Sequence, residues 1–491
     1  MYRLVLYYLT VLMVGAALAG LFGIAALNPA NLAFSIIIIL AVCMAANKIF
    51  ARAFGAIPNI ESVYITALIL ALIISPVDPT DTAGIGFIVF ASLWAMASKY
   101  IFALGNKHVF NPAAFGVALA GIMTNQAATW WITSNPLLLA FVFIGGVLIV
   151  RKIRRTDLVI AFSIAALAAI VFTTNGNPLT AITMTLFHSS FFFLALVMLT
   201  EPLTMPPSRM PRIAYGALVG ILFAPNIHLG SFYFTPEIAL LAGNLFVYFT
   251  SPKRRFLLTL VEKSELADST NEFVFTPDYP ISFRPGQYIE WTLDGRAADN
   301  RGNRRYFTIA SSPTEPVVRL GVRFYTHAST FKQELLAIQP GDTLTASHAA
   351  GDFVLPSDPK QKLVFIAGGI GVTPFRSMVQ YLIDTKDARQ VTLLYSNKTF
   401  SEIAYKDFFD RTAQSIGMKT VYALTDEPVP IPGTHAGFID AALIKQEIPD
   451  YLACVFYISG PHGMVSAFTK TLNAMGVPRR KIKTDYFPGF A

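Results

Sequence analysis

Repeated apolar runs over the first 250 residues constrain this chain more than any other feature. A bilayer core of roughly 30 Å is crossed by about 20 apolar residues in a helix, and lipid offers the backbone no polar partner outside that helix. The chain has ten such segments, near residues 4–27, 31–47, 62–76, 84–104, 111–125, 137–151, 157–174, 180–200, 211–226 and 234–250. The sequence therefore predicts a polytopic α-helical membrane domain over residues 1–250.

The charged residues of this part predict its orientation. Residues 1–250 hold 11 of the 38 Lys and Arg and 6 of the 30 Asp and Glu, so they carry +5 of the net charge of +8. Loops that keep Lys and Arg stay on the cytoplasmic side of a membrane. These cations lie at the N-terminus or around even-numbered connections: Arg3, Lys48, Arg52, Lys99, Lys107, Arg151, Lys152, Arg154, Arg155, Arg209 and Arg212. We expect a multi-pass protein of the cell membrane with both termini cytoplasmic and no nucleic-acid partner.

The two cysteines and the N-terminus indicate no further chemistry. Cys43 lies in an apolar run and Cys454 in a strand-like run, and two cysteines alone form neither a disulfide framework nor a thiolate metal site. We expect no bound metal. The first apolar segment is not followed by a convincing small-residue cleavage site, so we interpret it as a retained first helix.

The membrane half contains two stretches of similar sequence pattern. "TALILALIISP" closes the third segment and "FFFLALVMLTEPLTMPP" closes the eighth, each with a proline-containing turn. A spacing of five segments predicts two repeats of opposite orientation, which commonly frame a midplane site. The alternative is that the prolines only end helices.

Two stretches of this half carry a family resemblance. "GNKHVFNPAAFGVALAGI" and "LTEPLTMPPSR", together with the ten segments, resemble the family that contains the B subunit of the sodium-pumping NADH:quinone reductase and the D subunit of the Rnf electron-transport complex. The resemblance implies a flavin in the membrane domain, commonly FMN esterified to a threonine. At the matching connection this chain reads "TTNGNPLTAIT", without the acceptor threonine. We therefore expect a non-covalent second flavin, FMN or riboflavin, near Asn111-Pro112 and Thr200-Glu201-Pro202.

After residue 250 the pattern changes to short strands separated by Gly and Pro turns. "FRPGQYIEWTL" and "RYFTIASSP" are typical of a small antiparallel β-barrel, which we expect over residues 251–358. From "KLVFIAG" onward, strands alternate with helical runs, which predicts an α/β domain with a parallel sheet over residues 359–491.

A glycine turn lies at the start of this last domain, in "VFIAGGIGVTPFRSM". Gly368, Gly369 and Gly371 are expected to allow positive φ and a close approach of the backbone. Thr373 is expected to cap the following helix, with Pro374 in its first turn. The free N–H groups of that helix would then face a phosphate. The alternative is a tight strand-to-helix connection with no ligand.

The order of several motifs carries a second resemblance. "RRYFTIASSP", "STFKQELLAIQPGD", "GDFVLP", "AGGIGVTP", "YISGPHGM" and the terminal "DYFPGF" resemble ferredoxin–NADP reductase relatives across residues 255–491. The resemblance implies FAD on the barrel and NADH or NADPH on the parallel sheet.

The same resemblance implies roles for individual residues. Arg305 would pair with the FAD pyrophosphate, Phe307 and Thr308 would lie at the isoalloxazine, and Ser329 and Thr330 would start the helix that receives the pyrophosphate. Many relatives have Tyr at the position of Phe307, and the neighbouring Tyr306 is a candidate source of that phenol.

Further residues are implied around the nicotinamide. Ser459 replaces the usual Cys of a Cys-Gly-Pro motif, followed by Gly460 and Pro461, and Asp485 takes a position where Glu is frequent. The terminal aromatics Phe487 and Phe490 would shield the flavin face, or would only pack on the barrel. Phe307, Ser459 and Phe490 are thus the candidate catalytic residues.

The choice between NADH and NADPH is weakly encoded. Ser396 and Lys398 follow a predicted strand, where a 2′-phosphate could bind. A solvated lysine is the equal alternative.

Together the two halves predict a membrane electron-transfer enzyme. A nicotinamide gives two electrons as hydride, whereas a membrane path moves single electrons, and FAD converts between the two. We expect electrons to pass from cytoplasmic NAD(P)H through FAD to a membrane flavin, then to a quinone or an extracytoplasmic redox partner.

Two other functions remain open. A haem-carrying enzyme of the ferric-reductase or NADPH-oxidase kind needs paired axial histidines, whereas only His188 lies well inside a segment and His108 and His228 lie near ends. The second alternative is an ion transporter, or an anchor with a tethered reductase. Acidic residues near segment ends are compatible with ion coupling, namely Asp78, Asp81 and Glu201. Water would solvate them there, so they support a pump less than carboxylates inside the membrane would.

Overall fold

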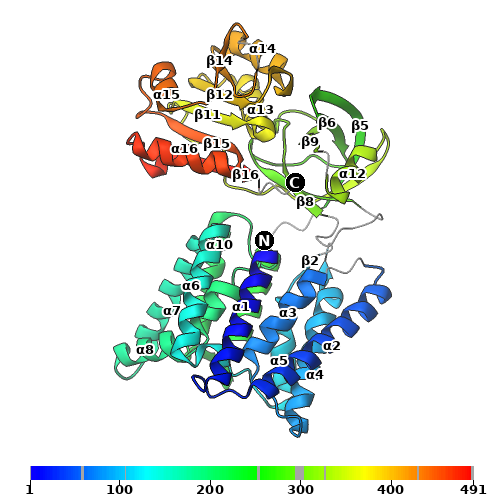
Figure 1. Cartoon of the computed structure of the whole chain (residues 1–491), viewed down its shortest axis with the longest axis vertical. Helices are drawn as coiled ribbons and strands as arrows, with labels where there is room; N and C mark the ends of the chain where they lie inside the picture. Colours follow the sequence, from blue (N-terminus) through cyan, green and yellow to red (C-terminus); the bar gives the residue numbers. More distant parts are fainter. Residues whose placement is uncertain are drawn as a thin grey trace. The chain divides into compact units, whose positions relative to one another are not determined.

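The computed structural model describes residues 2–56, 60–104, 107–250, 255–293, 304–325, 328–427 and 431–487 of the 491-residue chain. The chain divides near residue 252 into two compact units, an N-terminal helical unit and a C-terminal sheet unit (Figure 1). Each unit has its own buried core.

Helices occupy every apolar segment predicted in the helical unit. Their bounds are α1 Tyr2–Leu21, α2 Pro29–Ala53, α3 Ile60–Ile73, α4 Thr82–Ile101, α5 Pro112–Thr124, α6 Pro136–Ile153, α7 Thr156–Thr173, α8 Pro178–Phe187, α9 Phe191–Phe193, the π-helical turn η2 Leu194–Met198, α10 Arg209–Phe223 and α11 Pro236–Thr250. A short 3-10 turn, η1 Trp131–Thr133, precedes α6.

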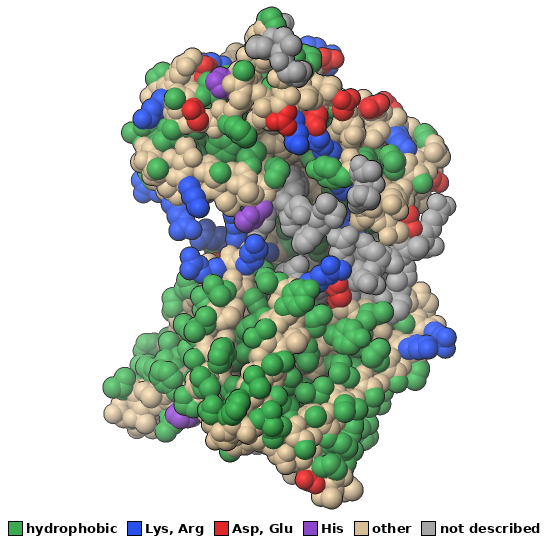
Figure 2. Space-filling model, in the orientation of Figure 1, with side chains coloured by type: hydrophobic (Ala, Val, Ile, Leu, Met, Phe, Trp, Pro, Cys, Tyr) green, Lys and Arg blue, Asp and Glu red, His purple; other side chains and the backbone are tan. Residues whose placement is uncertain are grey.

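Not all of these helices are long enough to cross a membrane. Among the described residues five are long and apolar enough, namely α1, α2, α4, α6 and α7, and a sixth span results if α8 and the α9–η2 segment count as one, bent by 62°. Helices α3, α5 and α11 are apolar but shorter. The surface of the unit is dominated by hydrophobic side chains (Figure 2), including Phe172 at 87% exposure and Ile37 at 67%.

An Asn-Pro pair starts four of these helices. Asn28, Asn111, Asn135 and Asn177 each accept a backbone N–H of the first turn with the side-chain oxygen, and a proline follows each of them. The asparagine satisfies an N–H that would otherwise lack a partner, and the proline has no N–H to satisfy. These four prolines therefore mark helix starts, and whether the prolines of the two similar stretches frame a repeat stays a prediction.

The order of elements nevertheless recurs in the two halves of the helical unit. A two-stranded hairpin precedes α5 (β1 Ala103–Leu104 and β2 Lys107–His108), and another precedes α11 (β3 His228–Leu229 and β4 Phe232–Tyr233). Helix α2 packs on α4, and α7 packs on α10. Glycines allow close contact in both halves, because a Cβ on Gly116 would lie 2.2 Å from Ala91 O and one on Gly220 would lie 2.4 Å from Phe162 O.

The sheet unit begins with an antiparallel sheet. Its strands are β5 Phe256–Ala267, β6 Thr270–Pro277, β7 Tyr288–Thr292, β8 Arg304–Thr308, β9 Val318–Arg323 and β10 Thr343–Ala346, in the order β8-β7-β10-β5-β6-β9. Helix α12, Thr330–Ala337, packs on its core through Phe331 and Leu335. The described strands form an open sheet, whose edges approach where Ala310 N donates to Arg319 O at 2.9 Å. Closure into the predicted barrel stays a prediction.

A parallel sheet completes the unit. Its strands are β11 Leu363–Gly368, β12 Val391–Asn397, β13 Lys419–Leu424, β14 Thr434–Ala436, β15 Val455–Pro461 and β16 Ile482–Phe487, in the order β14-β13-β12-β11-β15-β16. Helices α13 Thr373–Asp384 and α14 Lys406–Ile416 share a core with one face, and α15 Ala441–Glu447 and α16 His462–Ala474 share a core with the other. The strand order reverses between β11 and β15, and ligands bind at the carboxyl ends of strands at such a point.

Ion pairs join the two sheets. Glu315 accepts from both Arg376 and Arg319, and Arg319 also pairs with Glu272. Burial raises the pKa of the Tyr405 hydroxyl well above its ordinary value, so it stays protonated and donates to Glu272 at 2.9 Å. These contacts join the starts of α13 and α14 to β6 and to the loop between β8 and β9.

Candidate functional site

The three glycines of the turn after β11 serve different purposes. Only Gly369 has positive φ, at +52°, while Gly368 is extended with φ −122°. A Cβ on Gly368 would lie 2.2 Å from Met464 Sδ, and one on Gly371 would lie 2.6 Å from Ser459 O. The prediction of positive φ for all three is therefore wrong, because two of them are needed for close contact between strand ends.

The helix after the turn starts differently from the prediction. Thr373 is already helical, with φ −52° and ψ −44°, and Val372 precedes it as the cap residue. The Thr373 hydroxyl donates to Ile370 O at 3.2 Å, so the predicted capping role of Thr373 is wrong. Pro374 lies in the first turn as predicted, and no described side chain caps α13. Thr373 N already donates to Ile370 O and Pro374 has no N–H, so this helix start offers an anion mainly the positive end of its dipole.

The end of β15 meets this turn. Ala367 of β11 is in register with Ser459 of β15, and the Cβ of a side chain at Gly460 would lie 3.2 Å from Gly368 Cα. The Ser459 side chain is fully buried, and its hydroxyl has no hydrogen-bond partner among the described residues. A buried hydroxyl without a partner fits a ligand that supplies one. The two predicted nucleotide segments thus converge where the strand order reverses.

The neighbouring strand β16 ends at Phe487, one of the two terminal aromatic residues predicted to lie at the flavin. Pro461 is in register with Phe487, and Ser459 is in register with Asp485. The backbone of β16 therefore runs beside the Ser459 position. Phe490 lies outside the described residues, so its predicted catalytic role stays a prediction.

The predicted FAD residues lie together on β8 and α12. Arg305 and Phe307 are two residues apart and so face the same side of β8. The Phe307 ring lies 5.9 Å from the Phe331 ring, and the Arg305 guanidinium carbon lies 5.4 Å from that same ring. Phe331 is the second residue of α12, so the guanidinium lies near the start of this helix.

The start of α12 agrees with its prediction. Ser329 is the extended cap residue and Thr330 the first helical residue, and no described side chain caps the first turn. Thr308 is buried and is paired with Tyr288 across the strands. A cation beside an uncapped helix start suits a pyrophosphate, so these residues fit FAD.

Tyr306 does not replace the missing phenol at Phe307. Adjacent residues of a strand point to opposite faces, and Tyr306 is 54% exposed with its ring against Tyr288. The side chain that a flavin ring would meet at this position is therefore the phenyl group of Phe307.

Lys398, a candidate for binding a 2′-phosphate, has an acidic neighbour. Its Nζ lies 3.8 Å from Asp426 Oδ2, and both side chains are more than half exposed. Phe400 N donates to the nearby Glu427 carboxylate at 2.7 Å. The surroundings of Lys398 thus offset its charge, and neither nicotinamide is singled out.

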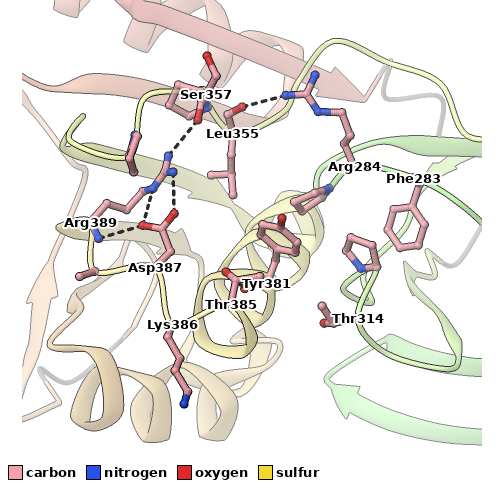
Figure 3. Close-up of a pocket in the computed structure, with 15 residues that line it drawn as sticks. Phe283, Arg284, Thr314, Leu355, Ser357, Tyr381, Thr385, Lys386, Asp387 and Arg389 are labelled. Atoms are coloured by element: carbon pink, nitrogen blue, oxygen red, sulfur yellow. Dashed lines mark hydrogen bonds and ion pairs between the residues drawn. The ribbon is translucent and has the colours of Figure 1, made fainter.

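A large cavity of the sheet unit lies away from these residues. Its volume is about 810 Å³, and Arg284, Tyr381 and Thr385 line it (Figure 3). Arg389 donates to Asp387 within it and holds the pKa of that carboxyl below its ordinary value. Tyr381 and Thr385 belong to the carboxyl end of α13, whereas the glycine turn is at the other end, about 18 Å away for twelve residues. The size of this cavity is therefore no guide to the nucleotide site.

A buried polar cluster occupies the helical unit. Glu201 accepts from Asn111 Nδ2 at 2.8 Å and from Thr204 Oγ1 at 3.2 Å, and its other oxygen lies 3.1 Å from His108 Nε2. Asn244 accepts from Asn111 N at 2.8 Å and donates to the Tyr215 hydroxyl. The structure thus brings together the two segments predicted to line a second flavin.

The sequence prediction missed part of this cluster. It placed Glu201 at a solvated segment end, whereas the side chain is only 19% exposed and has three polar neighbours. It did not include Asn244, which is fully buried in α11. An asparagine inside the apolar run "LLAGNLFVYF" was the available signal, because polar residues inside membrane helices are commonly functional.

Comparisons with known proteins concern the second half of the chain. The family model described as "Oxidoreductase NAD-binding domain" matches residues 365–470. A flavohemoprotein of Oceanobacillus iheyensis is 26% identical over 245 residues, covering 46% of this chain and 58% of the relative. The F subunit of the Na⁺-translocating NADH-quinone reductase of Methylococcus capsulatus is 29% identical over 236 residues, covering 45% of this chain and 56% of the relative.

Solved structures are similar over the same share of the chain. An Amycolatopsis cytochrome P450 reductase has a TM-score of 0.44 and 25% identity over 48% of this chain and 70% of its own. The FAD/NAD-binding domain of a Vibrio cholerae nitric oxide dioxygenase has a TM-score of 0.43 and 21% identity over 47% and 98%.

The matches cover little more than half the length of the curated relatives. The family model and these relatives confirm the prediction of an FAD-dependent NAD(P)H oxidoreductase for the C-terminal half. The resemblance of the first 250 residues to a membrane flavoprotein stays a prediction.

Proposed function

We propose that this chain is a membrane-bound flavin oxidoreductase. Electrons pass from cytoplasmic NADH or NADPH through FAD to a second flavin, bound non-covalently in the helical unit, and then to a quinone or an extracytoplasmic acceptor. One observation carries the proposal. Asn111 Nδ2 donates to Glu201 at 2.8 Å, which joins the two segments predicted to line a second flavin, in a chain whose other half is a reductase.

The nicotinamide is held at the point where β11 and β15 meet. The uncapped first turn of α13 receives the pyrophosphate, and Gly371 lets the strand ends approach. The Ser459 hydroxyl, which has no bond within the described chain, orients the carboxamide by a hydrogen bond. Ser459 therefore fixes which face of the nicotinamide is presented.

FAD is held by β8 and α12. When bound, FAD accepts the hydride and releases electrons one at a time. Arg305 would bind the pyrophosphate beside the start of α12, the Phe307 ring would pack on the isoalloxazine, and Thr308 would offer it a hydroxyl. No phenol lies at this position, so the ring is held by packing more than by hydrogen bonds.

The second flavin is held by the polar cluster of the helical unit. Asn111, Asn244 and Glu201 bring amide and carboxylate groups together in an apolar surrounding, where they bond one another. A bound flavin edge would exchange some of these contacts for its own donors and acceptors.

The proposed topology has ten segments and a cytoplasmic reductase. The distribution of Lys and Arg supports it, since the cations lie around connections that would share one side. The recurring order of helices and hairpins in the two halves supports an inverted repeat with the cluster at its centre.

Flavin quantification on the full chain tests the proposal. We expect two flavins per chain, both released to the supernatant by acid precipitation. Flavin left in the pellet would mean covalent attachment, and a single FAD would mean that the helical unit has no flavin of its own.

A haem route makes a different prediction. The purified full chain would then show a Soret band, whereas the flavin route gives only flavin absorption. In the described chain His108 is bonded to Glu201 and His228 Nδ1 lies 2.8 Å from Gly230 O. Each contact uses one ring nitrogen, as histidine ligands of a metal commonly do, so the absorption spectrum decides between the two routes.

A further inference from the structure

His108 and Glu201 form a buried ion-pairing contact that electron transfer alone does not need. His108 Nε2 lies 3.1 Å from Glu201 Oε1, with the side chains 8% and 19% exposed. An imidazole and a carboxylate in contact share a proton readily, and histidine changes its charge near neutral pH. The contact is therefore suited to proton transfer.

The groups around this contact come from five helices of the same unit. Glu201 also accepts from Asn111 at the start of α5 and from Thr204 before α10. Lys99 of α4 lies close enough for its charge to act on Glu201, and it donates to Ser62 of α3 at 3.0 Å. The Tyr215 hydroxyl of α10 faces the cluster through Asn244 of α11. Lys99 is the cation among these neighbours, and its charge balances that of the carboxylate.

A membrane redox carrier needs protons as well as electrons. The hydride given to FAD brings two electrons and one proton, but only electrons pass onward between separate flavins. A second flavin that accepts two electrons must take up two protons at its ring nitrogens to become dihydroflavin, and a quinone must take up two protons to become a quinol. These protons have to arrive within the apolar helical unit.

We propose that His108 and Glu201 deliver protons to the redox carrier bound at the cluster. Glu201, the more exposed partner, takes protons from water, and His108 holds the transferable proton. This inference rests on the proposed function, since it assigns proton supply at the proposed second-flavin site. New protons then reach the pair from the proposed cytoplasmic side, where the connections that carry Lys and Arg lie.

Isosteric variants test the assignment. His108→Gln and Glu201→Gln keep a hydrogen-bonding side chain of similar size but cannot carry the proton. His228→Gln is the matched control, because His228 is an exposed histidine of the same unit that bonds only to Gly230 O within the described chain. All variants are made in the full-length chain, and bound flavin is counted in each.

Two acceptors separate proton supply from electron supply. Ferricyanide takes an electron and no proton, whereas ubiquinone-1 takes two of each. We expect His108→Gln to keep the wild-type NADH–ferricyanide rate, and both Gln variants to lose about 100-fold in NADH–ubiquinone-1 rate, the lower range for general acid catalysis. The residual quinone rate should fall about tenfold for each unit rise in pH, as free protons replace the lost donor. The control should match the wild type.

An equilibrium measurement removes the dependence on turnover. In the wild type, the midpoint potential of the second flavin plotted against pH should bend, because the His108–Glu201 pair exchanges a proton with the reduced flavin. The bend should disappear in Glu201→Gln. A merely structural role would shift the line without removing the bend.

Solvent deuterium provides a test on the wild type alone. Quinone reduction in D₂O should slow at least twofold, whereas ferricyanide reduction should not change. Equal rates in both solvents would overturn the proposal even if the variants fail to fold or lose their flavin.

The outcomes distinguish this inference from the function beneath it. A wild-type chain with a single FAD would overturn the second flavin and the proton pair together. A wild-type chain with two flavins, whose Gln variants keep its quinone rate and pH profile, would overturn the proton pair alone.

Discussion

At the scale of single residues, the nucleotide turn is determined by contacts across the parallel sheet. The motif "GGIG" predicts a turn, but not which of its glycines needs positive φ. Only Gly369 does, because Gly368 and Gly371 face the end of β15, some 90 residues later in the chain. For the same reason, no local sequence pattern could predict that the buried Ser459 hydroxyl lacks a hydrogen-bond partner among the described residues.

Gly371→Val should therefore disable nicotinamide use and leave FAD bound. The new Cβ would lie 2.6 Å from Ser459 O and 2.7 Å from Gly460 Cα, so the ends of β11 and β15 must move apart. A misplacement of about 1 Å at a reaction centre costs roughly 100-fold in rate. We expect this loss in kcat/KM for NADH with ferricyanide as acceptor.

The matched control is Gly463→Ala in the first turn of α16. A Cβ there meets nothing within 4 Å, so activity and FAD content should both stay at the wild-type level. Normal NADH-dependent reduction by Gly371→Val would contradict the proposed close contact.

At the scale of helices and strands, patterns local in sequence were predictive and pairings distant in sequence were not. Ten apolar runs became helices, and the alternation of strands and helices after residue 361 became a parallel sheet. The sequence did not show that α8 and α9 meet at a 62° bend, nor that Asn244 would meet Asn111. Run length and periodicity are local properties, whereas these contacts depend on how helices pack.

The ion pairs between the two sheets give a test at this scale. Glu315→Ala should leave Arg376, whose side chain is 9% exposed, without its carboxylate. Breaking a buried pair by removing one partner costs about 3–5 kcal/mol, and we expect the lower value because Glu315 is 16% exposed. The measurement is thermal unfolding of the full chain followed by FAD fluorescence, which should show a clearly lowered midpoint.

Asp450→Ala is the control for this substitution. It removes the pair with Lys362, in which both side chains are over 40% exposed, and exposed pairs contribute little. Its unfolding midpoint should stay near that of the wild type. Equal midpoints for both variants would show that the Glu315 pairs do not hold the sheets together.

At the scale of the whole molecule, the division near residue 252 separates two kinds of chemistry. The proposed phosphate-binding turn would take water-soluble ligands, and helices as apolar as these suit lipid. Their presence in one chain is explained if electrons leave the nucleotide in water and are used in the membrane. The alternative, in which the helices only anchor a reductase, predicts that the sheet unit alone performs the full reaction.

Expression of residues 251–491 alone decides between these. We expect a soluble yellow protein with about one FAD, which reduces ferricyanide with NADH but does not reduce ubiquinone-1, because the second flavin and its proton supply stay with the helical unit.

Arg305→Ala in this protein should weaken FAD retention by roughly 10- to 100-fold, since a charge-assisted hydrogen bond contributes about 1.5–3 kcal/mol. FAD content after gel filtration measures that loss. If residues 251–491 reduced quinone at the rate of the full chain, the helical unit would be only an anchor. If Arg305→Ala kept all of its FAD, the assignment of Arg305 to the FAD site would be wrong.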